Sequence, residues 1–243
     1  MSAWRKAATA NLAWGVLLGA GLAWAAPFPV NFGTSWDGIS LQDVLDAEYG
    51  VGVIDALTDY EGYRAGDADP AYWEDLGLDG ILIREIAGYR NGNTLGWYQE
   101  SLAGAPDIDG NMDGIIFAGP VSPRESVMIA FPGGVTRFGF YLDPNGAGQE
   151  LFFTNRFYND EGLSGPGGGD VQCLIYNITH LRNGVPTFVL AWEDLDAGLP
   201  ITPTYEPGAT DNDYQDMVVE ITAFSPVKVE SESWGAVKSL YQD

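Results

Sequence analysis

The sequence has very few of the side chains on which disulfide-bonded folds and many enzymes depend. It contains one cysteine, Cys173, and one histidine, His180, in 243 residues. A single cysteine excludes an intrachain disulfide, and in the apolar run 171–176 we expect a buried, unreactive thiol rather than a reactive one. A zinc site would need paired histidines or cysteines, which the sequence lacks, and the single histidine argues against a histidine-dependent catalytic triad. His180 is expected at a strand end or turn. These absences predict a protein that is not an enzyme.

Basic residues are also scarce. The chain has 11 Lys and Arg against 34 Asp and Glu, a net charge of −23. Such a field repels nucleic acid and anionic lipid headgroups, so no nucleic-acid partner is expected. Aromatic residues make up 13% of the chain, enough for a packed core rather than disorder. Two interpretations of the acidity stay open: adaptation to a salty medium or solubility, and binding of divalent cations.

Long apolar runs are missing beyond the first residues. Residues 1–25 have two basic residues, Arg5 and Lys6, an apolar core, Leu12–Leu22, and a small-x-small cleavage pattern, Ala23–Ala25. This arrangement predicts a cleaved signal peptide, and the apolar core is short for an uncleaved membrane anchor. We therefore expect a secreted, extracellular or cell-surface protein with no membrane span after cleavage.

Thirty-two glycines and fourteen prolines separate short runs of β-branched and aromatic residues. This pattern predicts an all-β fold, an antiparallel β-sandwich of jelly-roll-like form with one or two short helices. The predicted strands are Gly80–Ile86, Thr94–Tyr98, Gly114–Phe117, Ser126–Phe131, Arg137–Leu142, Glu150–Phe153, Asp170–Asn177, Pro186–Ala191 and Met217–Phe224. One helix is expected to begin after Ser40, with Leu41, Val44 and Leu45 on one face and Asp43 in its first turn.

The predicted organisation has four parts. Residues 1–25 are the signal peptide, and residues 26–105 form an N-terminal β-rich segment packed on the main domain. Residues 106–226 form the β-sandwich domain, which carries an acidic pattern. Residues 227–243 are a C-terminal tail.

Five carboxylates flank a proline-rich loop, 197–210, between the apolar runs 188–191 and 217–221. They are Glu193, Asp194, Asp211, Asp213 and Asp216. Crowded buried anions are costly without a counter-ion, and calcium is the usual cation for sites made entirely of oxygen ligands. We predict a Ca²⁺ site here; the alternative is that these side chains hydrogen-bond to the backbone of turns.

A second oxygen-rich loop lies earlier in the chain. Asp109, Asn111, Asp113 and Gly114 reproduce the D-x-N-x-D-G opening of a calcium loop. The twelfth position is Pro120, where a helix-flanked calcium hand needs a glutamate, so a complete hand is excluded. A partial Ca²⁺ loop with Asp109, Asn111 and Asp113 as ligands and a plain Asp/Gly turn stay open.

The segments Phe188–Leu195 and Asp211–Val219 together resemble the signature of the bacterial secreted domain-of-unknown-function 4114 family, often found in exported, surface-sorted proteins. Upstream, residues 71–73, 86–89 and 93–98 resemble a segment that accompanies this domain. The resemblance implies a β-sandwich and is compatible with calcium at the five carboxylates, but it supplies no known activity. Gln215 replaces the usual Asn, and the family's C-terminal sorting tail is missing, so anchoring by that route is not expected.

We expect a non-catalytic, calcium-stabilised protein with a structural or adhesive role at the bacterial surface or matrix. An extracellular polysaccharide or a surface protein is the expected partner. A carbohydrate-binding module is the alternative, for which Tyr205 is the best surface aromatic, whereas Trp97 and Trp192 are expected in the core. A carboxylate-dependent glycoside-active enzyme is disfavoured, because the adjacent Glu193 and Asp194 point to opposite faces.

Overall fold

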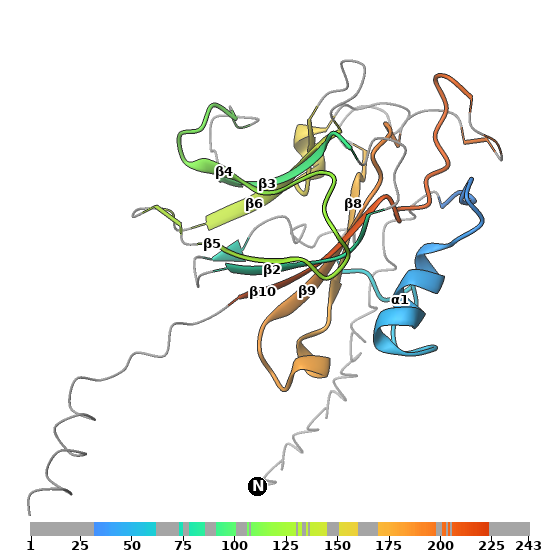
Figure 1. Cartoon of the computed structure of the whole chain (residues 1–243), viewed down its shortest axis with the longest axis horizontal. Coiled ribbons are helices and arrows are strands. Elements are labelled where there is room, and N and C mark those ends of the chain that lie inside the picture. The colour runs from blue at the N-terminus through green and yellow to red at the C-terminus, as the bar shows by residue number, and fades with distance from the viewer. Residues whose placement is uncertain are drawn as a thin grey trace, which may run out of the picture.

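The computed structural model describes residues 32–61, 73–74, 78–85, 91–100, 106, 108–129, 131–132, 135, 137–144, 151–159, 170–197, 201–202, 204 and 206–223. Figure 1 shows this part of the chain as strands with one short α-helix at one side. The predicted all-β class, with its two antiparallel sheets, is confirmed. The finer description, a jelly-roll-like sandwich, stays a prediction.

Within the described ranges each sheet has five strands, and all their pairings are antiparallel. The first sheet consists, in order, of β1 (Trp73–Glu74), β6 (Arg137–Pro144), β3 (Asn93–Gln99) and β4 (Asp113–Ala118), with β7 (Phe152–Phe153) also on β6. The second consists of β5 (Ser126–Ile129), β2 (Leu78–Glu85), β10 (Met217–Ala223), β9 (Thr187–Trp192) and β8 (Cys173–Asn177). Both sheets contain strands from before and from after residue 105, so this position does not separate one sheet from the other.

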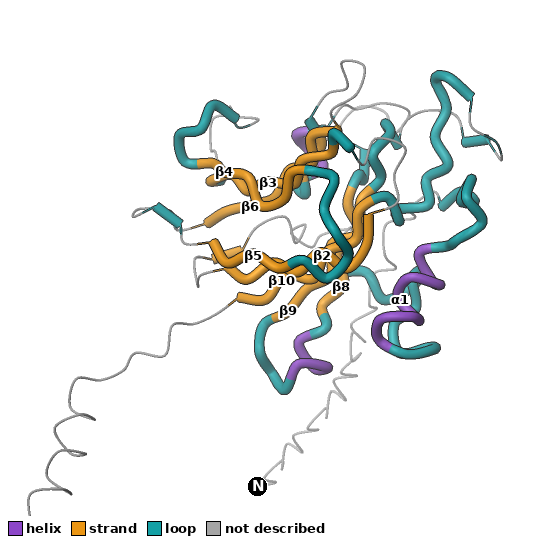
Figure 2. The backbone as a smooth tube through the Cα atoms, viewed as in Figure 1, coloured by secondary structure: helices purple, strands orange, loops and turns teal. Residues whose placement is uncertain are grey.

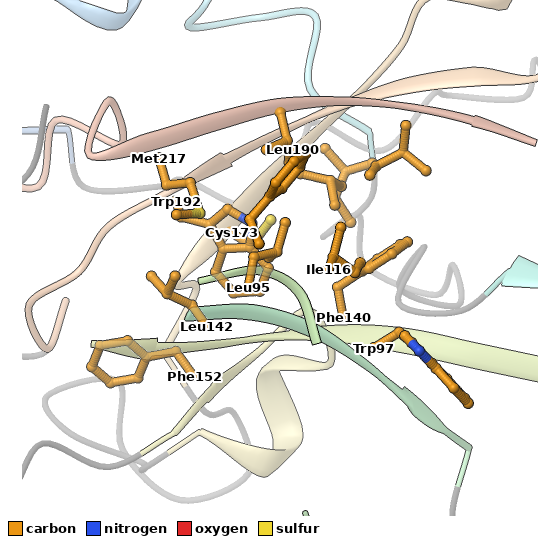
Figure 3. Close-up of a cluster of buried hydrophobic side chains, with 14 of the residues drawn as sticks. Leu95, Trp97, Ile116, Phe140, Leu142, Phe152, Cys173, Leu190, Trp192 and Met217 are labelled. Atoms are coloured by element: carbon orange, nitrogen blue, oxygen red, sulfur yellow. The ribbon is translucent and has the colours of Figure 1, made fainter. Parts of the chain in front are cut away.

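The main core lies between the two sheets, which Figure 2 shows as separate layers of strands. Alternation along β6, β8 and β9 sends every second side chain into this space. Leu190 and Trp192 of β9 meet Leu95 of β3 and Leu142 of β6 there, and all four are fully buried (Figure 3). Burying a large apolar side chain contributes about 1.5–3 kcal/mol, so this interior is the main source of stability.

The opposite face of the second sheet is covered by α1 (Leu41–Tyr49). Ser40 caps the helix, and its side chain and that of Asp43 form a reciprocal capping box. Leu41, Val44 and Leu45 are buried against side chains of β8, β9 and β10. The helix predicted after Ser40 is therefore confirmed, together with its buried face.

The C-terminal end of α1 is held by the buried carboxylate of Glu220. Tyr49 donates a hydrogen bond to Glu220 of β10 (2.9 Å), and Arg182 donates to the other oxygen of the same carboxylate (3.0 Å). Arg182 lies in a short 3-10 turn, Thr179–Arg182, and its guanidinium also stacks over the Tyr49 ring at 5.5 Å. Helix and sheet are thus joined by charge as well as by apolar contact.

None of the helices in the described ranges is long and apolar enough to cross a lipid bilayer. The predicted signal peptide, 1–25, and tail, 227–243, lie outside the described residues, as does Tyr205.

Candidate metal centre

The acidic pattern comes together where β9 ends and β10 begins. Met217 pairs with Trp192 in the antiparallel register, and the N–H of Asp216 donates to the carbonyl of Trp192 (3.2 Å). Glu193 follows β9 directly, and residues 211–216 lead into β10. Strand pairing therefore sets the two acidic segments side by side.

Four acidic side chains converge at this point: Glu193, Asp211, Asp213 and Asp216. One oxygen of each lies within 4.8 Å of the others. Glu193 is completely buried, Asp211 and Asp213 are 5% exposed, and Asp216 is the least buried of the four. The Glu193 carboxylate accepts hydrogen bonds from the N–H groups of Leu195 (3.2 Å) and Asp213 (3.1 Å), which fix its direction. We call these four residues the acidic cluster, and they form a group that can hold a metal ion.

The backbone on either side of Asp213 is unusual. Asn212 and Tyr214 both have positive φ, 49° and 56°. Asparagine tolerates this region, but a bulky residue there is an outlier that the surrounding structure must hold in place. The buried Tyr214 is held by a hydrogen bond from its hydroxyl to the carbonyl of Val171 (2.8 Å) and by its ring contact with Phe32, at 5.4 Å. The Asp211 and Asp213 side chains of this segment both belong to the acidic cluster.

Residues 32–37, which we call the N-terminal strap, lie against the cluster. The N–H of Trp36 donates to Asp211 Oδ2 (2.9 Å), and the N–H of Gly33 donates to the carbonyl of Asn212 (3.0 Å). The indole of Trp36 donates to the carbonyl of Thr202 (2.8 Å). In Figure 1 the blue start of the described chain and the orange-red loop before β10 lie on the same side of the molecule.

Burial and mutual repulsion disturb the ionisation of the cluster. Burial raises the pKa of Glu193 well above its usual range, and the Asp211 carboxylate raises it further. The pKa of Asp216 is raised in the same way, by burial and by Asp194. Burial and Asp213 raise the pKa of Asp211 to about 7, and burial raises that of Asp213. Full ionisation at neutral pH therefore requires a compensating positive charge.

None of the ion pairs seen in the described part of the chain supplies that charge. The ion pairs formed there by Arg124, Arg137 and Arg182 go to Glu48, Glu100 and Glu220, away from the cluster.

A buried amide beside the cluster also has a free acceptor. Gln215 is 3% exposed, and its Nε2 donates to Asp213 Oδ2 (2.9 Å), Ser35 Oγ (2.9 Å) and Asp37 Oδ1 (3.0 Å). Its Oε1 is buried and accepts no hydrogen bond from any described residue. An unsatisfied buried acceptor next to four carboxylates is the polar surrounding expected of a cation site.

Asp194, the fifth predicted ligand, is not among the four residues that the structure gathers. Its carboxylate accepts a hydrogen bond from the Asn93 side chain of β3 (3.1 Å), while its backbone N–H donates to Asp216 Oδ2 (3.0 Å). Asp194 is buried and its charge raises the pKa values of Glu193 and Asp216. It therefore takes part in the electrostatics of the site and connects it to the first sheet.

The second predicted site lies at the start of β4, in a turn. The Asp113 carboxylate accepts hydrogen bonds from the N–H groups of Asp109 (3.0 Å) and Gly110 (2.9 Å), and Asp109 accepts one from the N–H of Asn111 (2.8 Å). Asp109 and Asn111 are exposed. These hydrogen bonds are typical of an Asp/Gly turn, which is the alternative interpretation of this loop. Calcium binding at Asp109, Asn111 and Asp113 stays a prediction.

The remaining predicted residues lie away from the cluster. Cys173 is a buried thiol, and burial raises its pKa well above the usual value, as expected of an unreactive cysteine. His180 is exposed in the 3-10 turn after β8. Trp97 and Trp192 are core residues, as predicted.

Sequence reasoning missed the strap, Asn93 and the role of Gln215. The Ser35-Trp36-Asp37-Gly38 stretch has the composition of a turn, and nothing in it signals a contact with residues far along the chain. Comparison with protein-family models, with curated proteins and with solved structures finds no match. The resemblance to the domain-of-unknown-function 4114 family therefore stays a prediction.

Proposed function

We propose that this chain is an exported, non-catalytic β-domain that binds Ca²⁺ in the acidic cluster and has a structural or adhesive role at a bacterial surface or matrix. The observation that carries the calcium proposal is the convergence of four buried carboxylates with no basic partner in the described residues. The separation of their oxygens, up to 4.8 Å, is about the distance across a calcium coordination sphere.

The chemistry of the donors favours calcium over other divalent ions. Glu193, Asp211, Asp213 and Asp216 would hold the ion, and all their ligand atoms are oxygens, which suit Ca²⁺ and Mg²⁺ rather than zinc or copper. Magnesium requires shorter, strictly octahedral contacts and keeps several waters, which suits a crowded, buried set of carboxylates poorly. The bound ion would supply the positive charge that the folded cluster lacks.

The burial of the cluster supports a role without catalysis. Hydrolysis of a glycoside needs two carboxyl groups that reach the sugar, one acid and one base. Glu193 is fully enclosed, and burial raises the pKa of all four carboxyl groups in the same direction. An ion at this place would join the ends of β9 and β10 to the strap, which gives rigidity to a chain with no intrachain disulfide.

The proposal is tested by thermal unfolding with Ca²⁺, with Mg²⁺ and with a chelator. An ion present at 100 times its Kd stabilises the folded state by about 2.7 kcal/mol. For a domain of this size the Tm then rises by about 5–10 °C. We expect such a rise with Ca²⁺, a smaller one with Mg²⁺, and none with Ca²⁺ in Asp213→Ala.

Glu206→Ala is the matched control, because Glu206 is an exposed acid of the same loop and is not part of the cluster. It should keep the full rise in Tm. Equal melting curves for the unmodified chain in Ca²⁺ and in chelator would remove calcium from the proposal.

A further inference from the structure

A pocket of about 450 Å³ lies beside the acidic cluster, between the strap, the start of α1 and residues 55–57. Binding sites for small molecules usually have volumes of about 300–1,000 Å³. Its wall includes Phe32, Thr34, Ser35, Asp55, Leu57 and Asp213. Asp213 thus belongs both to the pocket and to the cluster.

We propose that this pocket binds a neutral polyhydroxyl ligand, one sugar unit in size, and that a cation in the acidic cluster strengthens this binding. The coupling rests on the proposed calcium site, whereas the pocket itself does not.

Two polar groups of the pocket are available to a ligand. The Thr34 hydroxyl is exposed and makes no hydrogen bond within the described residues. Asp55 accepts the N–H of Leu57 through Oδ1 (2.8 Å), which leaves its other oxygen available. A hydroxyl group both donates and accepts, so a sugar can donate to Asp55 and exchange a hydrogen bond with Thr34.

The pocket also offers apolar surface of two kinds. Phe32 is partly buried, and its ring is held by Tyr214 at 5.4 Å and Tyr60 at 6.3 Å. Leu57 also lines the pocket and is 60% exposed. The C–H faces of a sugar ring bury such surface while its hydroxyls keep polar contacts.

Charge narrows the class of ligand. Asp55 and Asp213 lie in the wall, none of the described lining residues is basic, and the chain carries a net charge of −23. Phosphates, sulfates and uronic acids are therefore repelled. With Asp213 engaged by the proposed ion, a cationic ligand would pair with the exposed Asp55, and exposed ion pairs contribute only about 0–1 kcal/mol. A neutral ligand with several hydroxyls uses more of the available groups.

The strap couples the pocket to the cluster. It forms one wall of the pocket, and Asp211 and Asn212 of the acidic segment bind the N–H groups of Trp36 and Gly33. An ion that fixes the acidic segment also fixes this wall, so ion and ligand favour the same arrangement. Their affinities then increase together, by the reciprocity of linked equilibria.

The test is isothermal titration calorimetry of the full-length chain with the methyl glycosides of glucose, mannose, galactose and fucose. Each titration is made in millimolar Ca²⁺ and in chelator. We expect at least one glycoside to bind, with a Kd about fivefold or more lower in Ca²⁺. Thr34→Val and Leu57→Ala should each weaken binding about 3- to 10-fold, through loss of one hydrogen bond or one apolar contact.

Thr58→Val and Val51→Ala are the matched controls, because both residues are exposed nearby and neither lines the pocket. They should bind as the unmodified chain does. Absence of glycoside binding while Ca²⁺ still raises the Tm overturns the pocket proposal and leaves the calcium site standing. Binding that Thr34→Val and Leu57→Ala do not change, or preference for a lysine methyl ester, overturns it as well. Equal affinity in Ca²⁺ and chelator overturns the coupling.

Discussion

Among the described side chains, Asp211 has a shifted pKa that lies in a pH range where unfolding is easily measured. Burial and the neighbouring Asp213 raise its pKa to about 7, against a usual value of 3.8. The folded chain therefore binds more protons at this residue than the unfolded chain does, at any pH between these two values. Glu193 and Asp216 shift in the same direction. Each of these shifts destabilises the folded state when the carboxyl group must ionise.

We expect the free energy of unfolding, measured in chelator, to rise as the pH is lowered from about 8 to about 6. The sign follows because stability falls with rising pH wherever the folded state holds more protons. Saturating Ca²⁺ should flatten or reverse this slope, since the ion favours the ionised carboxylates. Urea unfolding at a series of pH values measures both slopes. Asp211→Asn should reduce the slope in chelator, and stability that increases with pH in chelator would contradict the account.

The residues of the site were only partly predictable from the sequence. Composition and spacing identified Glu193, Asp211, Asp213 and Asp216, because crowded carboxylates next to strand-like runs are visible in one dimension. They also included Asp194, whose carboxylate the structure directs to Asn93, a partner 101 positions away. Such a partner depends on how the two sheets pack, which local patterns do not encode.

At the next scale, the strands were more predictable than the segments between them. All nine predicted strands overlap observed ones, since β-branched and aromatic runs bounded by glycine and proline are local signals. The two-residue β1 was missed because it is too short to show alternation. The strap was missed because its hydrogen bonds to the acidic segment span 175 to 180 positions of sequence.

Gly33 offers a direct test of the strap. A Cβ at this position would lie 1.6 Å from the carbonyl oxygen of Asp211, and backbone cannot give way as a flexible side chain can. Gly33→Ala should therefore displace the strap, lower the free energy of unfolding by about 1–3 kcal/mol and reduce the rise in Tm produced by Ca²⁺. Chemical unfolding and thermal melts with and without Ca²⁺ measure the two effects.

The control for this substitution is Gly184→Ala. Gly184 has φ of 84°, and nothing lies within 4 Å of a Cβ built there. Its replacement costs about 1–2 kcal/mol through backbone strain alone and should leave the calcium effect intact. If Gly33→Ala and Gly184→Ala respond equally to Ca²⁺, the strap does not contribute to the metal centre.

The whole molecule carries its negative charge in two environments that salt affects differently. Exposed acidic residues such as Asp37, Asp55, Asp109 and Glu206 contribute to a surface field, which monovalent ions screen over about 10 Å at 0.1 M. The acidic cluster is largely buried, so dissolved monovalent ions screen its charges less. The surface field corresponds to adaptation to salt, and the acidic cluster corresponds to binding of a divalent cation. The two environments should therefore respond differently to added ions.

We expect millimolar Ca²⁺ to raise the Tm of the chelated protein more than NaCl does at equal ionic strength. Screening of the surface field relieves general self-repulsion, whereas Ca²⁺ in the cluster removes the local cost of ionising buried carboxylates. The effects should also separate by variant. Asp213→Ala should lose the response to Ca²⁺ and keep the response to NaCl, and thermal melts of both proteins in each salt make the comparison. If NaCl and Ca²⁺ at matched ionic strength stabilise the two proteins equally, the acidity acts only through the surface, and the cluster has no special place in the fold.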